Sequence, residues 1–64
     1  MKNRLKEVRT AKGMSQYELA EKSNVSRAVI WGIETGRKTV IKTDTIERLA
    51  ETLKEPVHKI FFLP

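Results

Sequence analysis

The chain of 64 residues is predicted to fold as a compact all-α domain of five helices, and three features of its sequence support this prediction. Apolar residues recur at the three- and four-residue spacings of amphipathic helices. Serine, asparagine and glycine residues, which begin and end helices, stand between these segments. The chain contains no repeat and no low-complexity stretch, so residues 1–64 are interpreted as a single domain.

The first two helices are predicted over residues 3–12 and 16–22. Gly13 is suited to end the first helix, because glycine adopts the left-handed backbone conformation at little cost. Ser15 is suited to cap the second helix, and Glu18, three residues further on, completes the pattern of a capping box.

The third helix is expected over residues 26–34, with Ser26 as its N-cap and Ile30 facing inward. Asn24 lies where the chain must reverse, and asparagine tolerates the left-handed conformation that such turns require. Residues 16–35 therefore have the spacing of a helix-turn-helix, whose second helix can enter the DNA major groove. Any small helical bundle also has capped helices joined by short turns, but the turn asparagine favours the helix-turn-helix.

A basic connection over residues 36–42 leads to a fourth helix predicted over residues 44–53, with Thr43 as its N-cap. The inward face of this helix is expected to hold Ile46, Leu49, Ala50 and Leu53. A short fifth helix is predicted over residues 57–62, with Pro56 at its cap or in its first turn.

Positive charge is concentrated in the N-terminal part of the chain. Residues 1–42 hold ten Lys and Arg against four Glu, whereas residues 43–64 hold three Lys and Arg against four Asp and Glu. This imbalance is typical of a protein that presents one end to a polyanion such as nucleic acid. A modest net charge also serves solubility alone.

The composition argues against several other classes of protein. There is no cysteine, no long apolar run, no signal peptide and no lipidation motif, so a cytoplasmic protein without membrane attachment is expected. His58 is the only histidine, and no second histidine or cysteine completes a metal site with it. No enzymatic activity, cofactor, metal or small-molecule ligand is expected.

Short segments in a characteristic order extend over nearly the whole chain. They are residues 5–9, 12–16, 18–20, 25–27, 33–36, 45–50 and 57–61. Their order and spacing resemble those of the lambda-repressor-like, Cro/C1-type (Xre family) transcriptional regulators. The resemblance implies a five-helix fold and double-stranded DNA as the partner. The chain departs from the family pattern at Lys54, where a glycine often follows the fourth helix, and at Ser23, where a larger apolar residue is common.

The outward face of the third helix is the predicted reading surface. Arg27 suits the O6/N7 edge of guanine, although a phosphate contact is the alternative. Trp31 either packs on the DNA or folds down against the fourth helix or the following loop. A glycine destabilises a helix by about 1 kcal/mol relative to alanine. Gly32 therefore suggests close approach of the backbone to DNA or to a neighbouring helix, with neutral drift as the alternative. The predicted DNA-binding residues are Gln16, Tyr17, Ser26, Arg27, Ala28, Trp31, Gly32, Thr35, Arg37 and Lys38.

The remaining predicted DNA contacts are to phosphates. Gln16 begins the second helix, where the helix dipole favours a phosphate, and in the family the matching Gln often makes such a contact. Arg37 and Lys38 follow the third helix and are expected to bind phosphate, although they also suit a solvated loop. The resemblance further implies that Arg9 and Glu34 form a structural ion pair.

The C-terminal segment is more apolar than one short helix can bury. Phe61, Phe62 and Leu63 are therefore predicted to form a homodimer interface, with closure of the monomer core as the alternative.

The expected function is that of a repressor that binds a palindromic operator as a dimer. Two alternatives are an antitoxin-type or adaptor protein with autoregulatory DNA binding, and a module that binds protein alone.

Overall fold

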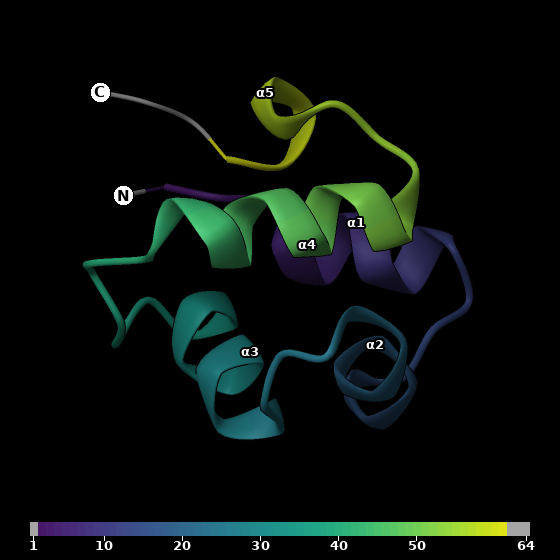
Figure 1. The fold of residues 1–64 in the computed structure, drawn as a ribbon, viewed down its shortest axis with the longest axis horizontal. Coiled ribbons are helices and arrows are strands. Elements are labelled where there is room, and N and C mark those ends of the chain that lie inside the picture. The colour runs from purple at the N-terminus through teal and green to yellow at the C-terminus, as the bar shows by residue number, and fades with distance from the viewer. Residues whose placement is uncertain (1, 62–64) are drawn as a thin grey trace.

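Five α-helices account for most of residues 2–61, the part of the chain that the computed structural model describes (Figure 1). They are α1 (Leu5–Ala11), α2 (Gln16–Ser23), α3 (Arg27–Glu34), α4 (Thr43–Leu53) and α5 (Val57–Ile60). Within this range the only extended pairing is an isolated antiparallel bridge between Asn3 and Phe61. The predicted five-helix, all-α fold is confirmed. None of the helices described has both the length and the apolar character that a membrane crossing requires.

The turn signals in the sequence act as expected around α2 and α3. The hydroxyl of Ser15 accepts a hydrogen bond from the backbone N–H of Glu18 at 3.0 Å, and the Glu18 carboxylate accepts one from the backbone of Ser15. The hydroxyl of Ser26 accepts from the backbone N–H of Val29 at 3.1 Å. Asn24 ends α2 in the left-handed conformation, with φ 59°. These contacts confirm the predicted capping box, cap and turn.

Three helices begin elsewhere than predicted, and α3, which begins at Arg27, is displaced by one residue. Asn3 lies outside α1, and its side-chain oxygen accepts a hydrogen bond from the backbone N–H of Leu5 at 3.0 Å, so the helix begins two residues later than expected. Thr43 is the first residue of α4 and not its cap. Lys42 stands at the cap in extended conformation and makes no side-chain capping bond. The predicted cap at Thr43 is therefore wrong.

The core joins all five helices and the residue that follows α5. Helix α2 packs against α3 and α4, α1 packs against α3, and α5 packs against α4. In the view of Figure 1, α4 lies between α5 on one side and the α2–α3 pair on the other. The side chains that are almost completely buried are Leu5, Leu19, Ile30, Ile33, Leu49, Leu53, Ile60 and Phe61.

Phe61 belongs to this core and not to a dimer interface. Its side chain is 1% exposed, and its backbone is extended because it pairs with Asn3. The neighbouring backbone N–H of Arg4 donates to the carbonyl of Ile60 at 2.7 Å. The prediction that Phe61 contacts a second subunit is wrong, because its side chain is buried in the core of this chain. The other two predicted interface residues, Phe62 and Leu63, lie outside the described residues.

Candidate nucleic-acid interface

The core holds α3 by one face and leaves the opposite face open. Ile30 and Ile33 are fully buried, and Val25 fills the turn below them at 7% exposure. Arg27 and Ala28, in the first turn of α3, are exposed. The inward and outward faces of α3 therefore follow the predicted helical spacing at these positions.

Trp31 lies further along the open face and carries a cation above its ring. Its side chain is 48% exposed. The guanidinium carbon of Arg37, from the loop after α3, lies 5.4 Å from the ring centroid. This distance is within the range of a cation–π contact, which at exposed sites contributes about 0.5–1 kcal/mol. Trp31 thus contacts the following loop and keeps about half of its surface accessible.

Gly32 does not point outward, so its predicted contact with DNA is wrong. It is buried, and a Cβ atom built on it would lie 3.2 Å from the Cβ of Lys38. The backbone N–H of Lys38 donates to the Gly32 carbonyl at 3.0 Å. The physical reason is the left-handed Gly36, at φ 77°, which turns the chain back across the end of α3. The segment that approaches this glycine closely is the loop, and neither DNA nor a neighbouring helix as predicted.

Arg9 and Glu34 lie in direct contact between α1 and the end of α3. Arg9 Nε lies 2.7 Å from Glu34 Oε2, and Arg9 Nη2 donates to Oε1 at 3.1 Å. Arg9 Nη1 also donates to the carbonyl of Met14 at 2.7 Å. The side chains of Arg9 and Glu34 are only 12% and 3% exposed. The hydrogen bond with Glu34 raises the pKa of Arg9 above its ordinary value.

Gln16 joins this pair from the start of α2. Its Nε2 donates to Glu34 Oε1 at 3.0 Å, so the Glu34 carboxylate connects α1, α2 and α3. A side-chain amide carries two N–H groups, and one of them remains for another acceptor. This geometry was not anticipated, because the two residues are far apart in the sequence and neither has a local signal for the other.

Asn3 is a structural residue that the sequence reading missed. Its Nδ2 donates to the carbonyl of Ile33 at 3.0 Å while its oxygen caps α1, so one amide connects the N-terminal segment with α3. Asparagine just before a helix is itself a capping signal. The predicted first helix includes residue 3, so this residue was not recognised as a cap.

The remaining predicted residues lie around α3. Tyr17 is 61% exposed on α2. Ser26, Thr35 and Lys38 are also exposed, and the Thr35 hydroxyl donates to the carbonyl of Trp31 at 2.8 Å. Residues from the start of α2, the open face of α3 and the following loop are thus presented from neighbouring elements.

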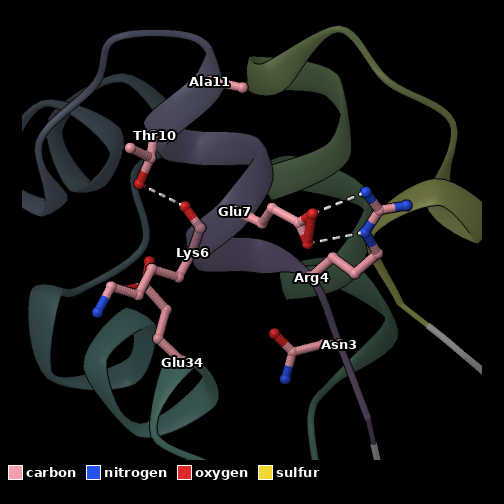
Figure 2. Close-up of a pocket in the computed structure, with 7 residues that line it drawn as sticks. All are labelled: Asn3, Arg4, Lys6, Glu7, Thr10, Ala11 and Glu34. Atoms are coloured by element: carbon pink, nitrogen blue, oxygen red, sulfur yellow. Dashed lines mark hydrogen bonds and ion pairs between the residues drawn. The ribbon is translucent and has the colours of Figure 1, made fainter.

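A separate hollow of about 620 Å³ lies along α1 (Figure 2). Its lining consists of Asn3, Arg4, Lys6, Glu7, Thr10, Ala11 and Glu34. Figure 2 shows the Arg4 guanidinium paired with the Glu7 carboxylate, and the Thr10 hydroxyl directed at the backbone carbonyl of Lys6. Among residues 2–61 no buried side-chain polar atom lacks a partner, and no group of three or more acidic, His or Cys side chains is placed to hold a metal.

The sequence matches the family model described as Helix-turn-helix over residues 5–60. The chain therefore belongs to the Cro/C1-type, Xre-like helix-turn-helix family of DNA-binding transcription regulators. A comparison with curated proteins gave no match.

Proposed function

We propose that this regulator is a sequence-specific repressor that inserts α3 into the major groove of double-stranded DNA. The observation that carries the proposal is the two-sided character of α3. Ile30 and Ile33 anchor one face of the helix in the core, while Arg27, Ala28 and Trp31 are exposed on its surface. A helix held in this way can read base edges without reorganising.

Arg27 is proposed to read a base directly. It is the first residue of α3, and recognition helices contact bases chiefly through their N-terminal residues. Among residues 2–61 the structure has no ion pair or hydrogen bond to its guanidinium, which is therefore available for the O6 and N7 atoms of guanine. Ala28 is proposed to contact a thymine methyl group.

The phosphate contacts are proposed on both sides of α3. Gln16 keeps one amide N–H beyond its bond to Glu34, and it stands at the positive end of the α2 dipole. Tyr17 and Ser26 offer hydroxyl groups nearby. On the other side Thr35, Arg37 and Lys38 supply a hydroxyl and two cations. These contacts hold the protein in register and contribute affinity without sequence preference.

A homodimer on a palindromic operator completes the proposal. Two-fold symmetric proteins of this kind bind two half-sites about one helical turn of DNA apart. Since Phe61 is buried, the apolar contact at the C-terminal end is proposed for Phe62 and Leu63. Residues 1–64 are proposed to act as one non-enzymatic DNA-binding domain in the cytoplasm.

The decisive experiment is selection of bound sequences from a pool of random duplex DNA. We expect enrichment of two inverted half-sites whose centres are about 10 base pairs apart. Enrichment of a single half-site would contradict the dimer and leave sequence recognition intact. Binding without any enrichment would contradict sequence-specific recognition.

The oligomeric state has its own test. Sedimentation of the wild type and of Phe62→Asp, with and without the selected operator, separates a stable dimer from one formed only on DNA. We expect Phe62→Asp to be monomeric and to bind a half-site weakly. A wild type that stays monomeric even on the full operator would refute the dimer.

A further inference from the structure

The loop after α3 returns so closely to the helix that a Cβ atom at position 32 would crowd Lys38. The Lys38 backbone N–H donates to the Gly32 carbonyl at 3.0 Å. A Cβ on Gly32 would stand 3.2 Å from Lys38 Cβ, which is tighter than nine in ten Cβ contacts and would require Lys38 to shift by a few tenths of an ångström. The helix itself does not need a glycine here, because Gly32 lies in an ordinary helical segment where alanine is preferred. The requirement comes from the loop.

The same return of the chain carries Arg37 over Trp31. The guanidinium carbon lies 5.4 Å from the centroid of the indole ring. A cation–π contact limits the number of side-chain conformations of an arginine and leaves its N–H groups available to other acceptors. An arginine arranged in this way loses less entropy when it binds a phosphate, because part of the ordering has already taken place.

We propose that Gly32 is a positioning residue for DNA binding, an inference that rests on the proposed function. The missing side chain at Gly32 lets Lys38 close onto α3, and this closure holds Arg37 on Trp31 as a preorganised phosphate ligand. Gly32 acts through Lys38 and Arg37 and makes no contact with the DNA itself.

The first test needs no DNA. The Arg37 guanidinium lies over the indole ring, so the NMR signals of the Arg37 side-chain protons should be shifted upfield in the wild type. Gly32→Ala should reduce this upfield shift. Its unfolding midpoint should stay within about 5 °C of the wild type, because the helix preference of alanine opposes the strain. The matched control is Gly32→Ala in a Lys38→Gly background, where the obstructing Cβ is gone and the upfield shift of Arg37 should persist.

The second test measures affinity for a pool of random-sequence duplexes of about 30 base pairs. Gly32→Ala and Arg37→Ala should each weaken binding about tenfold, as expected when one ordered contact is lost. The double variant should bind no more weakly than Arg37→Ala alone, because the two changes remove the same contact. In the Lys38→Gly background, Gly32→Ala should cause no further loss.

Three outcomes would overturn the proposal. They are an unshifted Arg37 in the wild type, Gly32→Ala binding as tightly as the wild type, and fully additive losses in the double variant. If Gly32→Ala alone does not fold, the comparison within the Lys38→Gly background still shows whether Gly32 acts through Lys38. A further loss of binding on Gly32→Ala in that background would contradict the proposal. A wild type that binds no duplex at all would refute the proposed function, and the NMR comparison would still show separately whether Gly32 holds Arg37 on Trp31.

Discussion

The Glu34 carboxylate lies 2.7 Å from Arg9 Nε with only 3% of its side chain exposed, and it connects the last residue of α3 to α1. Gln16 donates to the same carboxylate from α2. Paired charges taken this far out of water are balanced only while both partners remain. The orientation of α3 relative to the two helices before it therefore depends on this contact.

Replacement of Glu34 by alanine should lower the free energy of unfolding by about 1–3 kcal/mol, because Arg9 would remain largely buried without its partner. Urea unfolding of Glu34→Ala, Arg9→Ala and the double variant gives the coupling energy. The control is Glu7→Ala, which removes an exposed pair with Arg4 and should leave stability almost unchanged. A coupling energy near zero between Arg9 and Glu34 would show that the pair contributes nothing in solution.

The Arg27→Ala and Lys38→Ala variants should lose DNA affinity in different ways. Loss of Arg27 should cost about 1–3 kcal/mol on the selected operator and relax the preference at one position per half-site. Loss of Lys38 should weaken all sequences alike and lower the slope of affinity against salt by about one. Fluorescence anisotropy with specific and random duplexes at several salt concentrations separates these effects. If Arg27→Ala weakens both duplexes equally, Arg27 binds phosphate.

Lys54→Gly should stabilise the protein by about 0.5–1 kcal/mol. Lys54 ends α4 in the left-handed conformation at φ 56°, which strains any residue with a Cβ, and glycine removes that strain. Asn24→Gly is the matched comparison, because Asn24 ends α2 with nearly the same φ of 59°. Its gain should be smaller, since asparagine tolerates this conformation better than lysine. Thermal unfolding of both variants tests whether Lys54→Gly gains more stability than Asn24→Gly. A loss of stability in Lys54→Gly would contradict the prediction.

Stability should fall in acid partly through Glu55. Its carboxylate lies 2.9 Å from Nζ of Lys12, and this contact holds the pKa of Glu55 below its ordinary value. The folded state thus binds a proton less readily than the unfolded state. The stabilisation is present above the ordinary glutamate pKa of about 4.3 and is lost as the pH falls through the lower, folded value.

Urea unfolding between about pH 6 and pH 3 tests this contribution. Glu55→Gln should lose less stability over that range than the wild type. Glu47→Gln removes an exposed carboxylate of α4 that has no ion pair among residues 2–61, and it should follow the wild type. Equal acid losses in Glu55→Gln and the wild type would mean that the Lys12 contact does not hold in solution.

The sequence alone was sufficient to predict the turn between α2 and α3 and the inward face of α3. Ser15, Asn24 and Ser26 act through hydrogen bonds and backbone angles that involve only three or four neighbouring residues. The spacing of Ile30 and Ile33 is likewise a property of the helix itself. Such short-range interactions depend only on neighbouring residues in the sequence. They can therefore be predicted without knowing what the segment packs against.

Only the tertiary structure decided the ends of the chain and the segment that Gly32 faces. Asn3 and Phe61 are paired across nearly the full length of the sequence, which delays the start of α1, ends α5 and buries a ring predicted to be a dimer contact. Gly32 faces Lys38 because Gly36 turns the loop back onto the helix. Helical spacing specifies a direction around the helix axis, but the segment that occupies that direction is determined by how distant parts of the chain pack.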